Sequence, residues 1–270
     1  MRLGFTDSNI ALGYTGGFVA RASTVAISLF IPLYVNTYFI SNGFCRGSPH
    51  DSSPELKEEC RAAYILASIL SGVAQLFGLI CAPVFGHIAG RVRRRGGGNM
   101  TVRVASVLGI VGYTVFPQLE SPEYKDVDGR GGGPLVLLLV ALMGISQIGA
   151  IVCSLGSLGY GVLTADTAST IEGTEPGETT AATALLGAQS SRDTRNRIRL
   201  KGSIAGMYSW CGGAAILLLT KLGGYLFDKV GGGAPFYMMG VFNAVWLAVS
   251  LAIDMGREFR SSRGQHSQSA

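Results

Sequence analysis

Seven polar side chains in this sequence stand within or beside long apolar runs, where a polar group is costly and therefore informative. An arginine, lysine, amide or phenol in such a place can hold a polar solute by charge or hydrogen bonds. It can equally bond to a neighbouring helix. The seven candidates for contact with a solute are Arg21, Asn36, Gln75, Gln147, Tyr208, Lys221 and Asn243.

The two cations and the tyrosine have competing interpretations. Arg21 lies about one helical turn inside the first apolar run. It could attract an anionic solute or a partner carboxylate, or its stem could carry the charge to the headgroups. Lys221 lies far along the fifth run, where it reaches the outer headgroups unless it faces a solute path. Tyr208 opens that run and is suited to anchoring at the membrane interface.

The elements that must position these residues are membrane-spanning helices. Only 14% of the 270 residues are charged and the mean hydropathy is +0.36, whereas roughly 25% are charged in an average soluble protein. A helix needs about 20 apolar residues to cross a bilayer. Six runs meet or approach that length: 17–40, 62–88, 104–119, 135–163, 204–227 and 234–253. The sequence therefore predicts an all-α integral membrane six-helix bundle.

The distribution of basic residues predicts the orientation of this bundle. Thirteen Lys and Arg residues fall in the segments on one side of the membrane and six on the other. The positive-inside rule then places both termini on the cytoplasmic side. The membrane itself is expected to be either the plasma membrane or the vacuolar membrane. Because the net charge of +5 is spread between apolar runs, it does not indicate nucleic-acid binding.

The spans divide the chain into segments of different character. The segment between the fourth and fifth spans, 165–203, is rich in Thr, Ser, Ala and Gly. A flexible cytoplasmic connector is therefore expected there. The expected organisation is an N-terminal segment at 1–16, four spans within 17–164, the flexible loop at 165–203, two spans within 204–255 and a cytoplasmic tail at 256–270.

Two cysteines bound the first outer segment. Cys45 and Cys60 flank a polar stretch at 46–59, and a disulfide between them is expected in an oxidising compartment. The alternative is two free thiols at helix ends. No Cys/His set has the spacing of a metal site, and no cofactor is expected.

Small residues recur at every fourth position in the second apolar run. Ala74, Gly78 and Ala82 form this series, which continues through Gly86 and Gly90. Such a stripe lets another helix approach closely in a membrane. A chance run in a sequence with 39 glycines is the alternative.

The second apolar run ends in a glycine-containing basic sequence that includes Gly86, Gly90, Arg91, Arg94 and Arg95. It resembles the signature of the major facilitator superfamily, in which a glycine precedes an Asp-Arg pair and a basic cluster after the second helix of a six-helix half. Gly90 stands where the family has Asp. The stretches 28–36, 144–149 and 219–224 are similar to those of a poorly characterised fungal branch of that superfamily.

The resemblance implies a fold and an activity. The six spans would be helices seven to twelve of a twelve-helix transporter, which moves a small solute by alternating access between two halves. A missing N-terminal six-helix half, or a second copy, would complete it, and we expect this chain to be a truncated half. A non-transporting or inactive scaffold is the alternative. A channel comes third, because no ring of charges or filter-like loop is present.

Overall fold

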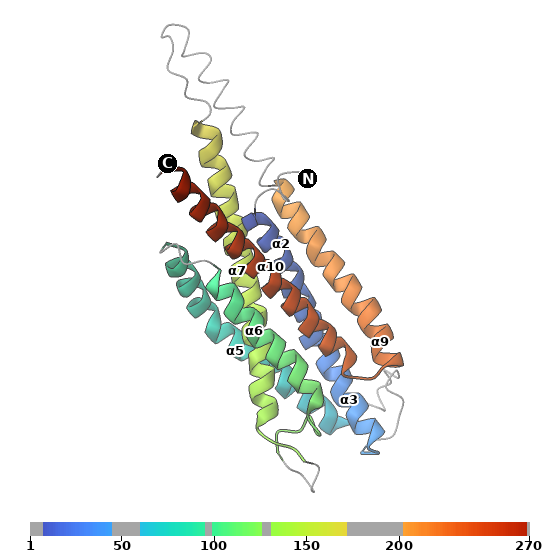
Figure 1. The fold of residues 1–270 in the computed structure, drawn as a ribbon. Helices are drawn as coiled ribbons and strands as arrows, with labels where there is room; N and C mark the ends of the chain where they lie inside the picture. Colours follow the sequence, from blue (N-terminus) through green and yellow to red (C-terminus); the bar gives the residue numbers. More distant parts are fainter. Residues whose placement is uncertain (1–7, 45–59, 95–98, 126–130, 172–201, 269–270) are drawn as a thin grey trace.

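The computed structural model describes residues 8–44, 60–94, 99–125, 131–171 and 202–268, and these residues form helices joined by turns and short loops, without strands (Figure 1). The fold is therefore all-α, as predicted. The helical elements are α2 (Ser8–Val25), η1 (Ala26–Phe30), α3 (Ile31–Ser41), α5 (Arg61–Arg94), α6 (Met100–Val115), η2 (Phe116–Gln118), α7 (Leu135–Ile171), a helix at 202–218, η3 (Leu219–Gly223), α9 (Gly224–Lys229) and α10 (Ala234–Gln268).

Among the described residues, six helices are long and apolar enough to cross a membrane, which makes the chain a multi-pass membrane protein. Their mean hydropathies lie between 1.4 and 2.5. The helices lie side by side in an elongated bundle, and α2 begins at the end of the bundle where α10 ends (Figure 1). The six spans are Ser8–Ser41, Arg61–Val92, Met100–Gln118, Leu135–Gly159, Gly202–Lys229 and Ala234–Gly256.

Three helix boundaries differ most from those expected. The first helix begins at Ser8, nine residues before the predicted start of the span. Helix α7 continues to Ile171, into the segment expected to be a loop, and α10 continues to Gln268, through most of the predicted tail. Apolar runs show where a helix crosses lipid, whereas these helices extend past the apolar layer. Residues 172–201, the rest of the predicted loop, lie outside the described residues.

The buried share of the spans follows the same order in the first three as in the last three. In the most apolar part of each span, 50%, 28% and 44% of residues are buried in the first three, and 56%, 22% and 33% in the last three. The first and fourth spans thus form the centre of the bundle. The second and fifth are peripheral.

The third and sixth spans lie against each other along their length, running in opposite directions. The rings of Phe116 and Phe236 are 5.0 Å apart between centroids at one end of this contact. Further along, a Cβ placed on Gly240 would lie 2.8 Å from the Thr114 methyl group. The other end of the contact is polar.

Two π-helical turns interrupt the first and fifth spans. They are η1 and η3, and both occur where the helices touch. A Cβ placed on Gly223 of η3 would lie 3.1 Å from Cζ of Phe30, the last residue of η1. Pro32 follows η1 in the first turn of α3, where its missing N–H cannot continue the hydrogen-bond ladder. A short irregular turn accommodates that loss without a break in the span.

The structure describes one of the two cysteines of the predicted outer disulfide. Cys60 is 2% exposed and disulfide-bonded, whereas Cys45 lies outside the described residues, so their pairing stays a prediction. The other three cysteines carry thiols, two of them half-buried and Cys153 buried.

Thiol counting tests the pairing of Cys45 with Cys60. Denatured protein prepared without reductant should react with a polyethylene-glycol maleimide at three cysteines, and at five after reduction, on a gel-shift assay. The variant Cys60→Ser should react at four with or without reductant, because the thiol of Cys45 is then released. Five reactive thiols in the unreduced wild-type protein would exclude the bond.

Candidate functional site

Arg21 lies near the middle of the bundle and is exposed. A Cβ placed on Gly212 would lie 2.8 Å from Cγ of Arg21, and Gly212 is the eleventh of 28 residues in the fifth span. Three residues after Arg21, Thr24 accepts a hydrogen bond from Gln147, the thirteenth of 25 residues in the fourth span. The arginine is thus about one helical turn from the centre of the bundle.

Arg21 belongs to a line of polar residues on the first span. This polar stripe comprises Arg21, Thr24, Ser28 and Asn36, of which Arg21 and Ser28 are exposed and the other two half-buried. The Ser28 hydroxyl donates to the Thr24 carbonyl oxygen at 2.7 Å, as a hydroxyl in a membrane helix does when no other acceptor is near. The guanidinium of Arg21 forms no hydrogen bond or ion pair with any described residue.

Gln147 and Tyr208 border the polar stripe from the fourth and fifth spans. The Nε2 group of Gln147 donates to Oγ1 of Thr24 at 3.0 Å. The Tyr208 hydroxyl lies 3.3 Å from Oγ of Ser154, and its ring occupies the space that a side chain at Gly17 would need. Tyr208 is half-buried between helices, so it does more than anchor the end of a span at the interface.

Three of the predicted solute contacts lie apart from this group. Gln75 is exposed on α5, and Lys221 is exposed within η3. Asn243 is fully buried between the third, fourth and sixth spans. Its Oδ1 accepts from Ser146 at 3.3 Å, and its Nδ2 donates to the Met239 carbonyl oxygen at 2.9 Å. We interpret Asn243 as a helix-packing residue, because no open surface reaches it.

The small-residue series on α5 packs against α7 over its first half. A Cβ placed on Gly144 would overlap the Ala74 carbonyl oxygen, and one placed on Gly78 would lie 3.1 Å from the Gly144 carbonyl oxygen. Ala82 is half-buried. The two helices therefore approach at the level of their backbones.

The motif that resembles the facilitator signature lies at the end of α5. Gly86, Gly90 and Arg91 are exposed, and a Cβ on either glycine would meet nothing within 4 Å. Arg94 is the last residue of α5, and Arg95 lies outside the described residues. The two glycines line a cleft of about 320 Å³ that continues between α6 and α7. These glycines leave an opening instead of a tight contact.

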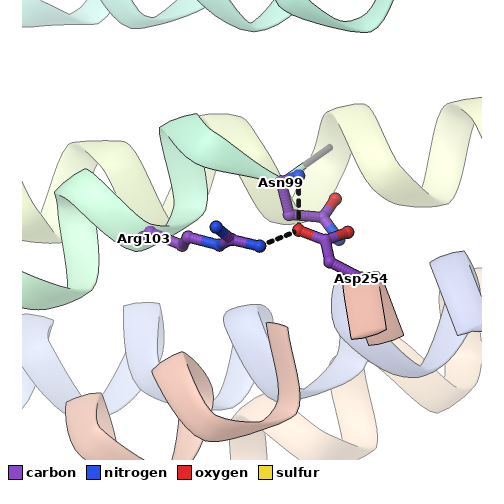
Figure 2. A network of polar contacts seen from close by, with 3 residues as sticks. All are labelled: Asn99, Arg103 and Asp254. Carbon is purple, nitrogen blue, oxygen red and sulfur yellow. Dashed lines mark hydrogen bonds and ion pairs between the residues drawn. The ribbon is translucent and has the colours of Figure 1, made fainter. Parts of the chain in front are cut away.

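A polar cluster that sequence reasoning missed joins the start of α6 to the end of the sixth span. Figure 2 shows the carboxylate of Asp254 between Asn99 and Arg103. It accepts from the Asn99 backbone N–H at 3.0 Å, from Asn99 Nδ2 at 2.9 Å and from Arg103 Nη2 at 2.5 Å. The carboxylate thus binds a cation and also caps a helix N-terminus, where the backbone dipole favours negative charge.

The sequence did carry a signal for this cluster. Arg103 opens the third apolar run and Asp254 closes the sixth, so the predicted topology puts both on the same side of the membrane. Pairing them required knowing that the third and sixth helices are neighbours.

Within the described residues, no group of three or more His, Cys, Asp or Glu side chains is placed to hold a metal ion. The polar stripe and its neighbours can therefore offer one guanidinium, hydroxyls and amides to a ligand. Comparison with known proteins finds no family model, curated protein or solved structure that matches the chain.

Proposed function

We propose that this chain is a six-helix half of a secondary transporter of the major facilitator type, which moves a small solute by alternating access. The observation that carries the proposal is the repeated burial order of the spans: high, low and intermediate in each group of three. Because each group has three spans, the second group runs in the opposite direction across the membrane. Nested inverted repeats of three helices build each half of such transporters.

The polar stripe supports a path for the solute. A stripe that carries an exposed arginine near the middle of a span is unfavourable against lipid and is expected to face water or a protein partner. Such transporters bind their solute near the bilayer midplane, at the interface between their two halves. The first span here has the polar residues that such a position requires.

A second six-helix unit is the proposed partner. The second and fifth spans are the least buried, and they expose large apolar side chains such as Leu79 at 71% and Leu217 at 63%. Either lipid or another six-helix unit can cover these faces. The proposed transporter joins this chain to an N-terminal half or to a second copy, with both termini on the cytoplasmic side of a plasma or vacuolar membrane.

Reconstitution tests this proposal. Three kinds of proteoliposome would be prepared. They would contain the chain alone, two copies of the chain fused in tandem, or the chain fused to the C-terminal end of the N-terminal half of a facilitator. Uptake of labelled anions, sugars and amino acids would be measured with and without the same solute inside. A carrier should show saturable uptake that internal solute accelerates in at least one arrangement. Absence of such uptake in all three would favour the non-transporting scaffold, and non-saturating flux would indicate a channel.

A further inference from the structure

We propose that the solute bound at the polar stripe is a small oxyanion, a carboxylate, phosphate or sulfate group, held by the guanidinium of Arg21. The inference deepens the proposed function and rests on it for the solute's path. Binding of the anion can be measured without any transport.

The depth and exposure of Arg21 make a counter-charge necessary. A charged side chain at the centre of a membrane helix carries a large free-energy cost when nothing balances its charge. Arginines near the ends of spans avoid this cost because their stems reach the headgroups. Arg21 lies about one turn from the middle of the bundle, so its stem does not span the remaining distance.

No described residue supplies that counter-charge. The described carboxylates are Glu120, Glu123, Asp166, Asp228, Asp254 and Glu258, and all lie beyond a span or within its last three residues. Asp254 is already bound to Arg103 and Asn99. A mobile anion is attracted to a positive charge that no described acid balances.

The packing around Arg21 holds the arginine in place for a ligand. Its stem lies against Gly212, where a Cβ would come 2.8 Å from Cγ. Tyr208 stands one turn before Gly212 on the same helix, with its hydroxyl beside Ser154. A guanidinium presents a planar fork of N–H donors that matches two oxygens of a carboxylate or phosphate. This arrangement favours an oxyanion over a neutral sugar or a cation.

Binding to the full chain in nanodiscs of phosphatidylcholine tests the inference. The probes are succinate, phosphate and sulfate, with glucose and choline for comparison, all at constant chloride, and the readout is the shift of the thermal midpoint with concentration. At least one of the three oxyanions should stabilise the wild-type protein. Arg21→Gln should weaken that binding at least tenfold, and Arg21→Lys by less. Arg91→Gln, which removes an exposed cation elsewhere on the molecule, should leave it unchanged.

Two adjacent glycines provide a test that keeps the charge. Gly212→Ala should displace the Arg21 stem and weaken oxyanion binding several-fold. Gly213→Ala should have no effect on binding, because a Cβ there meets nothing within 4 Å. This pair still tests the inference if Arg21→Gln fails to fold.

The inference is overturned if none of the three oxyanions binds, if binding is equal in Arg21→Gln, or if glucose or choline binds instead. It is also overturned if Arg21 is needed only for two copies to associate, since the arginine then pairs with a protein carboxylate. Oxyanion binding without flux would refute the proposed transport alone. Flux of a neutral solute that Arg21→Gln leaves intact would refute the anion alone.

Discussion

Replacing Gly144 with alanine should destabilise the bundle by about 2–3 kcal/mol, although alanine is the better helix former. The new methyl group would overlap the carbonyl oxygen of Ala74 and lie 2.6 Å from its carbonyl carbon. Both atoms are backbone, so no side chain can move aside, and α5 and α7 would have to separate. Thermal inactivation of detergent-purified protein, followed by fluorescence-detected size-exclusion chromatography, measures the loss.

Gly86→Ala is the matched control, because it is also a glycine-to-alanine change inside a long helix. Gly86 belongs to the small-residue series of α5, the helix that Gly144 of α7 contacts. A Cβ on Gly86 meets nothing within 4 Å, so alanine should be neutral or stabilise the helix by up to about 1 kcal/mol. Equal losses for the two variants would show that helix flexibility matters here and close packing does not. An unchanged Gly144→Ala protein would contradict the packing of α5 on α7.

Replacing Asp254 with alanine should cost a similar amount, about 2–3 kcal/mol. Breaking a buried ion pair by removing one partner costs about 3–5 kcal/mol, and the estimate is lower here because the Arg103 side chain is 39% exposed. The substitution also leaves the start of α6 without its cap. Asp254→Asn keeps an oxygen acceptor for the Asn99 backbone N–H and should therefore lose less.

A double-variant cycle isolates the contact of Arg103 with Asp254. The losses for Arg103→Gln and Asp254→Asn should not add in the combined variant, with a coupling of about 1 kcal/mol or more. Arg91→Gln combined with Asp254→Asn should be additive, because Arg91 is exposed at the end of a different helix. Additivity in both cycles would mean that the ion pair contributes nothing to stability.

The number of spans and their approximate positions were predictable from the sequence. A run of about 20 apolar residues has few stable places except a bilayer, and six such runs correspond to six helices of suitable length. The first helix start was missed because Ser8, Asn9, Thr15 and two nearby glycines lower the hydropathy there. Hydropathy reports the solvent around a helix, whereas in the bundle the neighbouring spans bury the two glycines and partly cover Asn9 and Thr15.

The surroundings of Arg21 could not be predicted from the spacing of apolar residues in the sequence. From the apolar run alone, Arg21 stood near the end of a span, where its stem reaches the headgroups. The contacts of Arg21 with Gly212 and of Thr24 with Gln147 place it near the centre instead. Which helices are neighbours also decided that Asn243 is buried and Gln75 exposed. Such neighbour relations follow from three-dimensional packing, which a single sequence does not reveal.

The π turns η1 and η3 keep the first and fifth helices in phase. A π turn closes its hydrogen bonds over five residues instead of four, so it inserts extra residues into a helix. In the first and fifth helices this insertion occurs at the same level along the bundle. The two helices touch at Gly17 and Tyr208 before the turns, and at Phe30 and Gly223 within them. Deleting one residue from either turn alone would rotate everything beyond it by about 100° and shift it by about 1.5 Å. The lengths of these two helices can therefore change only together.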